Sequence, residues 1–381
     1  MSEGTSSEWF ECSAPGRVNI LGEHTDYTGG MVLPMAIPFY THASIRRIKG
    51  NTSFLHTDLF EGEVAIHSNS PAEPTGQWSD YPVGVREEFR KLGIAVPSFE
   101  LHLRGNVPFG AGLSSSASVE VATCMALLAL SGIELPAKEI ALLCQRAENL
   151  FVGSPCGIMD QSVVTFAHEG HALMLNTRDL TFDLVPMNRG ALSNVTVVVV
   201  NSEVKHSVAT GAYRDRRHEA ETGQAEMQRR FGVRDLGEAT MTQVQQIAGE
   251  LDPVILKRVR HIVTENARVH AAREAMHGGD AERLGQIMLQ GHESMRDDYQ
   301  ITCNEIDFLV DMASTLPGCF GGRMTGGGFG GCTVNLVANG QIDEFSKAIT
   351  QQYESKFGIH CSIYPCVAVD GALALFQKVP Q

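Results

Sequence analysis

The sequence predicts a two-domain protein that contains both strands and helices. The chain has 381 residues, 43% of them hydrophobic and 19% charged, which is enough for a large core and for more than one domain. Strand-like and helix-like segments alternate in the first half, whereas the pattern beyond about residue 200 is mostly helical. We therefore expect a boundary within residues 187–194, which would separate a domain of residues 1–187 from one of residues 188–381.

The net charge restricts the kinds of partner that we expect, and the cysteine content indicates the cellular compartment. The 30 basic and 44 acidic side chains give a net charge of −14, which argues against nucleic acid or an anionic membrane as the main partner. The nine cysteines are odd in number and contain no C-x-x-C pair, as in a protein kept reduced. The first residues form no basic and apolar leader, and no apolar stretch is long enough to cross a bilayer. A cytoplasmic protein is predicted, and we expect it to act as a monomer.

Residues 14–30 combine charged side chains with glycines and apolar residues. Arg17, Glu23, His24 and Asp26 lie within ten residues on a turn-rich segment. Such groups are costly to bury without a partner, and each can donate or accept a strong hydrogen bond. They suit a polyhydroxylated substrate, whose hydroxyl groups each need a donor or an acceptor. The alternative is an internal ion pair that pins the turn.

The next segment alternates polar and apolar residues. This alternation predicts antiparallel strands over residues 40–68, and a helix is expected from about Pro82 to Leu92. Trp78 and Tyr81 stand at the start of that helix. They could line an adenine ring, although each alone is more simply part of the core.

Residues 105–117 read Gly-Asn-Val-Pro-Phe-Gly-Ala-Gly-Leu-Ser-Ser-Ser-Ala and join a predicted strand to a predicted helix over residues 117–130. The first turn of a helix carries unpaired backbone N–H groups and partial positive charge, so it can hold a phosphate. Gly110 and Gly112 allow the main chain to approach an anion, and the serines at 114–116 offer hydroxyls to phosphate oxygens or a metal. The loop lacks the lysine of the G-x-x-x-x-G-K-[ST] motif. A glycine-rich turn with a serine N-cap is the alternative.

A second glycine-bearing segment follows a predicted helix over residues 136–150. Residues 153–161 read Gly-Ser-Pro-Cys-Gly-Ile-Met-Asp-Gln and begin a new helix with Asp160 in its first turn. The helix dipole alone gives an ordinary reason for a carboxylate at that position. Because Glu148 and Asp160 flank a loop that could bind an anion, we favour a functional role for both.

The second half is predicted to be mostly helical. Residues 171–186 indicate a hairpin, and the β-branched run of residues 195–200 indicates a buried strand. Tyr213 could point into a binding site, whereas the run Arg214–Arg217 is interpreted as a solvated helix face. The expected helices cover residues 209–230, 239–248, 253–276, 281–294 and 303–314.

The last glycine-rich stretch covers residues 321–337. It contains the formal pattern G-x-G-x-x-G at residues 326–331, but a strand follows it, so it lacks the context of a dinucleotide-binding motif. We expect a glycine-rich hairpin whose backbone approaches a ligand or the first glycine loop. The segment from about Ser362 is strand-like and is expected to return to the sheets.

These separated motifs together resemble those of the GHMP kinases. Residues 16–27 resemble the signature of the members that act on galactose, residues 107–117 resemble the phosphate loop of the family, and residues 326–332 resemble its third motif. Residues 156–161 are similar to its catalytic-aspartate region. The resemblance implies an α+β fold of two domains with the active site in the cleft between them. It also implies ATP-dependent phosphorylation of the C1 hydroxyl of α-D-galactose, giving galactose 1-phosphate and ADP.

The resemblance also implies roles for single residues. Asp160 would act as a general base, or at least as the carboxylate that orients the sugar hydroxyl, and Arg17 would stabilise charge on the transferring phosphoryl group. Ser116 and Glu148 would bind Mg²⁺. The sugar would be held by Glu23, His24, Asp26, Gly157, Asp160 and Tyr213. The nucleotide would be held by Trp78, Gly110, Ala111, Gly112, Leu113, Ser114, Ser115, Ser116 and Ala117.

Two alternative functions stay open. Another sugar kinase of the family, such as one acting on N-acetylgalactosamine, would need room beside the C2 hydroxyl. The other alternative is a sensor that binds sugar and ATP without turnover. The known sensors of this kind are damaged in the serine core of the phosphate loop, whereas that core is whole here. Phe109 and Ala111 stand where many relatives carry smaller residues or glycine, which leaves the chemistry intact and the nucleotide affinity open.

Overall fold

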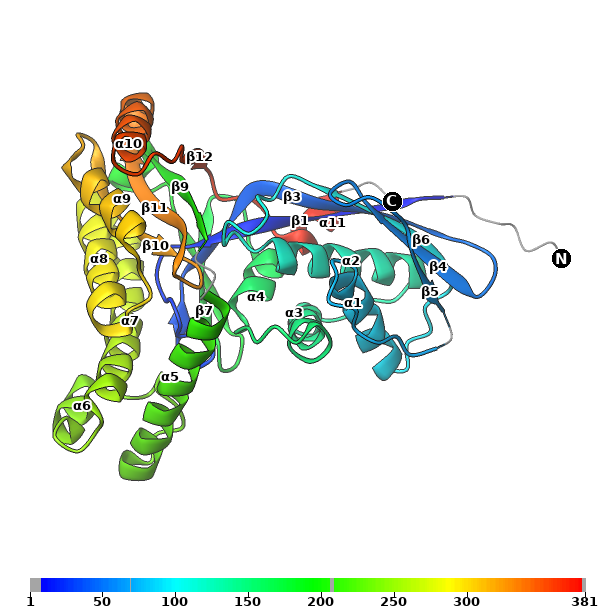
Figure 1. Cartoon of the computed structure of the whole chain (residues 1–381), viewed down its shortest axis with the longest axis horizontal. Coiled ribbons are helices and arrows are strands. Elements are labelled where there is room, and N and C mark those ends of the chain that lie inside the picture. Colours follow the sequence, from blue (N-terminus) through cyan, green and yellow to red (C-terminus); the bar gives the residue numbers. More distant parts are fainter. Residues whose placement is uncertain (1–7, 69, 206–208, 379–381) are drawn as a thin grey trace.

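The structure is a computed structural model that describes residues 8–68, 70–205 and 209–378. Figure 1 shows an elongated molecule in which a large sheet with helices beneath it forms one half and a helix-rich layer forms the other. The prediction that no basic and apolar leader is present rests partly on the first seven residues. These residues lie outside the described part of the chain. The described part contains sheets of five, four and three strands.

The first half is organised around the five-stranded sheet, in the order β1-β3-β6-β4-β5. Its neighbours are antiparallel except β4 and β6, which run parallel. Alternate residues such as Leu55, Leu101 and Leu103 are buried, because one face of the sheet packs on helices. The strands are β1 (Phe10–Asn19), β3 (Pro34–Arg47), β4 (Thr52–Thr57), β5 (Val64–His67) and β6 (Phe99–Gly105).

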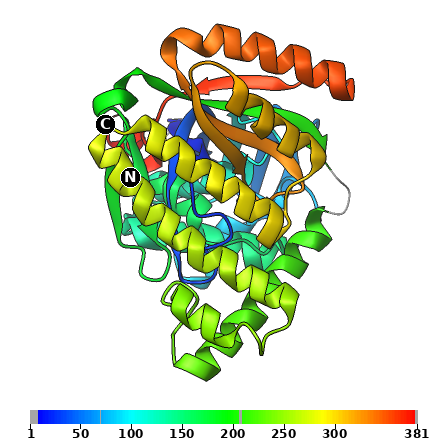
Figure 2. The same cartoon turned by 90° about the vertical axis from the view of Figure 1, so that its left-hand side faces the viewer.

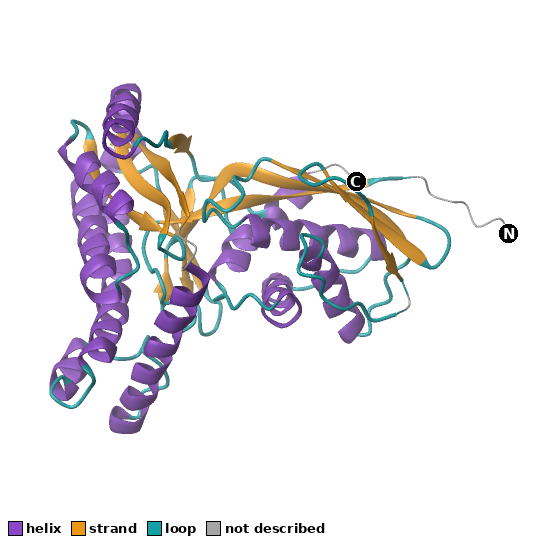
Figure 3. Ribbon diagram, viewed as in Figure 1, coloured by secondary structure: helices purple, strands orange, loops and turns teal. Residues whose placement is uncertain are grey.

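Helices of the first half pack under this sheet (Figure 3). The most central is α2, which is apolar almost all round and therefore lies in the middle of the core. It ends at Gly132, whose left-handed φ of 64° forms the C-cap. The helices are α1 (Asp80–Lys91), α2 (Ser115–Ser131), α3 (Ala137–Arg146) and α4 (Met159–Phe166), with a short π-helix, η1 (Ala147–Val152), after α3.

The second half is built on a four-stranded antiparallel sheet in the order β10-β11-β9-β12. Figure 2 shows the long helices α7 and α8 side by side in front of it. The strands are β9 (Val195–Lys205), β10 (Cys319–Thr325), β11 (Gly330–Ala338) and β12 (Ser362–Cys366). The helices are α5 (Ala209–Phe231), α6 (Met241–Ile247), α7 (Pro253–Gly278), α8 (Ala281–Ser294), η3 (Met295–Tyr299), α9 (Asn304–Thr315) and α10 (Ile342–Phe357).

The ends of the longest helix follow directly from the sequence. The side chain of Asp252 caps α7 by accepting hydrogen bonds from the N–H groups of Val254 and Ile255, and Pro253 takes the first helical position. At the other end Gly279 has a left-handed φ of 68°. The five predicted helices of the second half are confirmed to within a few residues at their ends.

The remaining predicted strands are also confirmed. Residues 171–186 form the hairpin of β7 (His171–Asn176) and β8 (Phe182–Pro186), which pairs with β2 (Met31–Val32) in the three-stranded sheet. Residues 195–200 lie in β9, and the tail strand β12 pairs with β9. The predicted glycine-rich hairpin is formed by β10 and β11.

The two halves share buried contacts. One cluster of buried residues contains Val18 and Met35 of the first half together with Val199 and Val334 of the second. The chain then returns to the first half through α11 (Ala372–Lys378), which packs against β1 and α4. Short connections within the fold are η2 (Gly190–Asn194) and η4 (Asn339–Gln341). The division into residues 1–187 and 188–381 stays a prediction.

Candidate active site

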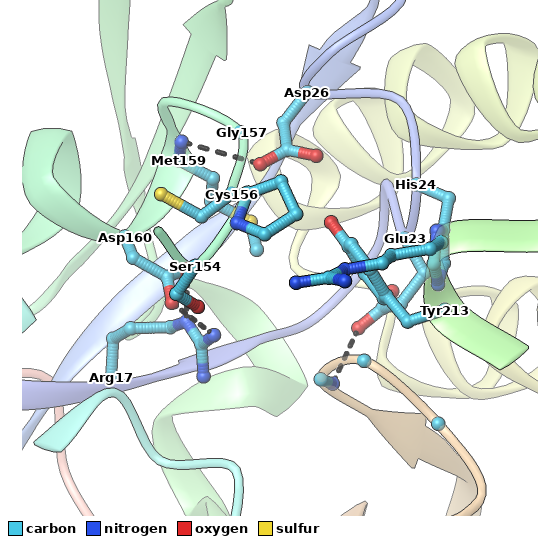
Figure 4. A pocket seen from close by; sticks show the side chains of 15 residues that line it. Arg17, Glu23, His24, Asp26, Ser154, Cys156, Gly157, Met159, Asp160 and Tyr213 are labelled. Carbon is cyan, nitrogen blue, oxygen red and sulfur yellow. Dashed lines mark hydrogen bonds and ion pairs between the residues drawn. The ribbon is translucent and has the colours of Figure 1, made fainter. Parts of the chain in front are cut away.

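A cavity of about 340 Å³ lies between the two halves, and this volume suits a small-molecule ligand. Figure 4 shows the side chains that converge on it from β1 and the loop that follows, from the first turn of α4 and the segment before it, and from α5, while the β10–β11 hairpin contributes backbone. All six residues expected to hold a sugar line it, namely Glu23, His24, Asp26, Gly157, Asp160 and Tyr213. The structure therefore brings together residues that are far apart in the sequence.

Arg17 and Asp160 form a two-pronged ion pair in this cavity (Figure 4). Arg17 Nε donates to Oδ1 of Asp160 at 2.8 Å, and Nη2 donates to Oδ2 at 2.6 Å. The hydroxyl of Ser114 also donates to Oδ2, at 2.5 Å. Because Arg17 Nη1 donates to the backbone oxygen of Gly112 at 2.6 Å, the same guanidinium fixes the carboxylate to the glycine loop.

The glycine loop joins β6 to α2, as predicted. Gly110, Gly112 and Ser114 have left-handed φ angles of 69°, 75° and 62°, which glycine adopts readily and serine seldom. The β10–β11 hairpin packs against this loop, since a Cβ added at Gly326 would lie 3.2 Å from the backbone oxygen of Gly112. The predicted approach of the third glycine-rich segment to the first is confirmed.

The carboxylate of Asp26 packs against the backbone of Gly157. A Cβ at position 157 would lie 1.8 Å from Asp26 Oδ2, so only glycine fits there. The N–H of Met159 donates to the same oxygen at 3.4 Å, which is a long hydrogen bond. Burial raises the pKa of Asp26 to about 6, and the negative charge of Asp160 adds to the rise. Asp26 is thus a half-buried acceptor in the cavity wall, available to the hydroxyl groups of a ligand.

Glu23 belongs to a buried cluster of charged groups. Its Oε2 accepts from Arg323 Nη2 at 2.7 Å, and its Oε1 accepts from the N–H of Gly326 at 3.3 Å. Arg323 Nη1 donates to Glu265 Oε1 at 2.6 Å, and that oxygen also accepts from the N–H of Gly22 at 2.8 Å. Burial raises the pKa of Glu23 to about 7, although Arg323 opposes the rise. The cluster ties the loop after β1 to β10 and α7.

His24 and Tyr213 bring aromatic rings to the cavity. His24 has a left-handed φ of 61°, which is uncommon for this residue type and often found at functional sites. Its Nδ1 lies 2.6 Å from the hydroxyl of Tyr27, which lies 2.9 Å from the hydroxyl of Tyr299. The ring of Tyr213, on α5, is centred 5.1 Å from that of His24. Burial lowers the pKa of His24 to about 3, with a smaller contribution from His261, so the imidazole is neutral.

The interpretation of Arg214–Arg217 as a solvated helix face is wrong for Arg216 and Arg217, whereas Arg214 and Asp215 are exposed. Arg214 is exposed but lines the cavity. The guanidinium of Arg217 lies 5.1 Å from the centre of the Tyr27 ring, and Arg216 Nε donates to the backbone oxygen of Tyr299 at 2.9 Å. The reason is helical spacing: residues three and four positions after Tyr213 share its face of α5.

A second cavity, of about 640 Å³, begins where the glycine loop enters α2. Ser115 and Ser116 line it at the start of this helix, and Trp78 and Tyr81 line it elsewhere. Trp78 is also partly buried against the core. Because Ser114 contacts Asp160 of the first cavity and its neighbour Ser115 lines the second, the loop connects the two cavities.

Two buried glutamates share a single amide donor close to Ser116. Gln161 Nε2 donates to Oε2 of Glu148 at 2.7 Å and to Oε2 of Glu120 at 3.0 Å. Within the described chain, Glu120 Oε1 is buried and makes no hydrogen bond. Burial raises the pKa of Glu148 to about 7, and Asp160 adds to the rise, whereas a hydrogen bond with Ser116 opposes it. Two carboxyl groups thus supply oxygen ligands beside Ser116, and a bound cation would favour their ionised forms.

Sequence reasoning missed the residues that support the site from outside the cavity. Arg323 and Gln161 lie within predicted motifs but are given no role by the sequence, and nothing in the sequence analysis identifies Glu120 or Glu265. One usable signal was present: Glu120 interrupts the apolar helix predicted over residues 117–130, and a carboxylate in such a place needs a partner. The partner itself could not be named, because it lies on another element.

Comparison with known families agrees with this geometry. Residues 80–168 match the model described as the GHMP kinases N terminal domain, and residues 272–355 match that of the GHMP kinases C terminal. A mevalonate kinase structure from Methanococcus jannaschii has the same fold, with a TM-score of 0.69 and 18% identity over 96% of this chain and 100% of that one. Fold and site together define a small-molecule kinase of the GHMP class, with the α+β architecture that the resemblance implied.

The more similar relatives define the family within this class. Residues 3–47 match the galactokinase galactose-binding signature. A galactokinase from Halalkalibacterium halodurans is 40% identical over 365 residues, which cover 94% of this chain and 91% of the relative. The crystal structure of Lactococcus lactis galactokinase complexed with galactose matches with a TM-score of 0.92 and 31% identity, over 96% of this chain and 95% of that one. The chain belongs to the galactokinase family, and its activity is that of a galactokinase.

Family membership implies that the enzyme uses ATP. None of the described helices combines the length and the apolar character that a bilayer-spanning helix needs.

Proposed function

We propose that the enzyme transfers the γ-phosphoryl group of ATP to the C1 hydroxyl of α-D-galactose and releases galactose 1-phosphate and ADP. The contact between Ser114 and Asp160 carries this proposal, since it joins a loop suited to phosphate with the carboxylate of the first cavity. The next residues of that loop line the second cavity. A sugar in the first cavity and a nucleotide in the second would bring the C1 oxygen and the γ-phosphorus to the same place.

Asp160 orients the C1 hydroxyl and accepts its proton as the new O–P bond forms and the bond from the γ-phosphorus to the bridging oxygen of ADP breaks. A carboxylate has about four acceptor positions, and Arg17 and Ser114 use three of them. One position is left for the substrate. Arg17 also stabilises negative charge on the transferring group, and because the transition state is loose, positioning matters more than basicity.

The sugar is held by groups that still have hydrogen-bonding capacity. Asp26 accepts a long bond from the N–H of Met159 and one from its own backbone N–H, which leaves acceptor positions of the carboxylate for ring hydroxyls. Neutral His24 can donate or accept, and Glu23 can accept while Arg323 holds it in place. Tyr213 contributes an aromatic ring and Gly157 a backbone that leaves room for the sugar. Galactose as the ligand is supported by the similar L. lactis structure, which is complexed with galactose.

The nucleotide is held by the loop and the start of α2, whose unpaired N–H groups face incoming phosphate oxygens. The second cavity supports this assignment, because Ser115 and Ser116 at the start of α2 lie in its wall together with Trp78. An adenine ring would pack there. The residues proposed for nucleotide binding are Trp78, Gly110, Ala111, Gly112, Leu113, Ser114, Ser115, Ser116 and Ala117.

Ser116 and Glu148 are proposed to hold Mg²⁺. This ion takes hard oxygen ligands, which the hydroxyl and the carboxylate supply. The fit is supported by two buried glutamates, Glu148 and Glu120, that have one amide donor between them. Mg²⁺ bound there would neutralise charge on the phosphate oxygens of ATP.

A coupled assay of ADP release tests the proposed substrate. Galactose, glucose, N-acetylgalactosamine, mevalonate and homoserine are supplied in turn at equal concentration with ATP and Mg²⁺. We expect galactose to give the highest kcat/KM. A higher value for N-acetylgalactosamine would favour the sibling sugar kinase, and binding of galactose and ATP without ADP release would favour the sensor.

The variant Asp160→Asn tests the proposed mechanism. We expect turnover to fall by at least about 10²-fold, because the isosteric amide cannot take the proton and its single oxygen can accept only one of the two Arg17 bonds. Nucleotide binding, followed by calorimetry with a non-hydrolysable ATP analogue, should stay within about twofold of the parent. Full activity in this variant would remove Asp160 from its assigned role.

We also propose that the enzyme works in the cytoplasm as a monomer. All nine cysteines are free thiols, and reduced cysteines are typical of that compartment. Sedimentation velocity at micromolar concentration tests the monomer, and fractionation of cells tests the compartment.

A further inference from the structure

A cluster of metal-type ligands lies on the open face of the five-stranded sheet. His56 on β4 and His102 on β6 are partners in the parallel ladder, and Glu100 precedes His102 by two residues, which places it on the same face. The intervening Leu55 and Leu101 are buried against the helices on the opposite face. Figure 1 shows α1 and α2 beneath these strands, on that buried side. None of the three polar residues lines either cavity of the active site.

The distances between these side chains suit a shared ion. Glu100 Oε1 lies 2.9 Å from His102 Nε2 and 3.8 Å from His56 Nε2. One ligand atom from each residue lies within 4.8 Å of the others. A fourth group is close, since Glu63 Oε2 lies 3.5 Å from His56 Nε2. The two imidazoles are 27% and 39% exposed, so an ion can reach them from solvent.

Zn²⁺ sets a clear geometric standard. Ligand atoms at about 2.0–2.1 Å from a tetrahedral ion lie about 3.3–3.4 Å from one another. Glu100 Oε1 lies 2.9 and 3.8 Å from the two imidazole nitrogens, on either side of this value, so small side-chain rotations bring these atoms toward it. Glu63 Oε2 is already at about this distance from His56 Nε2. Two imidazoles with a carboxylate are also a ligand set that Zn²⁺ takes. We propose that His56, Glu100 and His102 bind a divalent transition-metal ion of the Zn²⁺ class, with Glu63 as a fourth ligand.

Neighbouring side chains already orient two of the ligands. Arg46 donates through Nε and Nη2 to Glu100 Oε2, at 2.8 and 2.5 Å, which leaves Oε1 directed at the imidazoles. The ring of Trp9 meets that of His102 edge to face at 5.2 Å, and the Arg46 guanidinium lies 4.7 Å from the Trp9 ring. Outer partners of this kind fix the direction of metal ligands.

Because of where the cluster lies, a bound ion would affect the loop at one wall of the second cavity. His56 and Glu63 lie at the two ends of a loop, residues 57–62, and Leu59 and Phe60 of this loop line the second cavity. An ion bound by both ends would hold the loop closed at its base. Metal binding would therefore stiffen one wall of the cavity next to the glycine loop.

Calorimetric titration with Zn²⁺ tests the site. The full chain is first stripped with a chelator and then kept in excess Mg²⁺, so that the carboxylates of the active site are occupied. We expect one Zn²⁺ per chain, and His56→Gln and His102→Gln should each weaken its binding at least about tenfold. His42→Gln, at an exposed histidine on β3 of the same sheet, is the matched control and should bind as the parent does.

Two further measurements distinguish loss of metal binding from loss of folding. Co²⁺ bound at the site should show the strong visible absorption of a tetrahedral ion, and the double variant His56→Gln/His102→Gln should lose it. Circular dichroism and galactose phosphorylation show that each variant is folded, since neither histidine belongs to the active site. Equal Zn²⁺ affinity in the parent and the double variant, or equal loss in the His42 control, would overturn the proposal.

Discussion

Gln161 follows the proposed catalytic aspartate, but its amide donates to the two buried glutamates and does not line the first cavity. We predict that Gln161→Leu raises the Mg²⁺ concentration needed for half-maximal activity by about 10–100-fold. The reason is that Glu148 loses the shortest of the hydrogen bonds that orient it, since the Cys156 thiol donates to the same oxygen at 3.4 Å. Activity titrated against Mg²⁺ at saturating galactose and ATP measures the change.

The next residue provides a matched control. Ser162 is buried, and within the described residues its hydroxyl makes no hydrogen bond, so Ser162→Ala should leave the Mg²⁺ titration unchanged. Glu148→Gln should shift the titration more than Gln161→Leu does, because it removes a ligand. Identical titrations for the parent and Gln161→Leu would show that the amide does not position the metal ligand.

Asp26 should give galactose binding a pH dependence. In the free enzyme burial raises its pKa to about 6, so the carboxyl is protonated below that pH. The ionised form accepts more hydrogen bonds from sugar hydroxyls, and binding must then release the proton. The apparent Kd for galactose is therefore expected to rise by up to about tenfold per pH unit below pH 6. Calorimetry without nucleotide, at about pH 5 to 8, gives this profile.

The variant Asp26→Asn separates this effect from other titrations. It should bind galactose more weakly than the parent at neutral pH, with a Kd that changes less between about pH 5 and 7. An unchanged slope in the variant would assign the pH dependence to another group. Glu23 is the first alternative, because burial raises its pKa to about 7.

At the residue scale, the sequence predicted side chains that share a short motif. Arg17, Glu23, His24 and Asp26 stand within one turn-rich segment, so their meeting was visible in the sequence alone. The hydrogen-bonded and ion-paired residues that support these side chains from other elements were not visible in the sequence. Gln161 is 41 residues from Glu120, and Arg323 is 300 residues from Glu23, so only the folded chain brings each pair together.

At the scale of elements, the strand β10 carries a buried charge that joins three parts of the fold. Arg323 is fully buried between Glu23 and Glu265. We predict that Arg323→Met lowers the free energy of unfolding by about 3–5 kcal/mol, because two buried carboxylates lose their shared cation. Urea unfolding followed by circular dichroism measures this loss.

An exposed ion pair is the control for this change. Arg296 pairs with Asp297 at the surface, where the two side chains are 39% and 63% exposed. Arg296→Met should therefore cost less than about 1 kcal/mol. Equal losses for the two variants would mean that the buried cluster contributes no more than a surface pair.

The elements themselves were largely predictable, and their partners were not. Hydrophobic periodicity and caps such as Asp252 and Gly279 fix helices locally, which is why the helices of the second half were located correctly. Pairing between distant strands has no local signal, as in β9 with β12, where Val199 is opposite Tyr364. The π-helix η1 after α3 was also missed, because its hydrophobic pattern continues that of the helix before it.

At the scale of the whole molecule, the last described helix belongs in space to the first half. The N–H of Gly371 donates to the backbone oxygen of Ala167 at 2.7 Å, and a Cβ at Gly371 would lie 2.7 Å from the Ala167 nitrogen. We predict that Gly371→Val lowers the free energy of unfolding by roughly 1–3 kcal/mol, because backbone would have to move. Urea unfolding at neutral pH measures the change.

Gly340 offers the matched substitution. A Cβ there would have no neighbour within 4 Å, so Gly340→Val should change the free energy of unfolding by less than about 0.5 kcal/mol. If Gly371→Val proved equally mild, the return of the chain to the first half would not depend on close packing at this point.

A single boundary near residue 187 was predicted because composition changes there, but composition does not report which segments pack together. The cluster that contains Val18 and Val334 crosses that point, and Val369 bonds to Ala36. Contacts between such distant positions follow from topology, which one sequence does not reveal.

The late position of these contacts bears on synthesis of the protein. A domain made first commonly folds while the remainder is still being translated. Here the groove between β1 and α4 is filled by residues 369–376, so the early part of the chain leaves the ribosome with that groove open. Its final closure must therefore follow translation of the later half, and a nascent chain halted before residue 369 would be a target for chaperones.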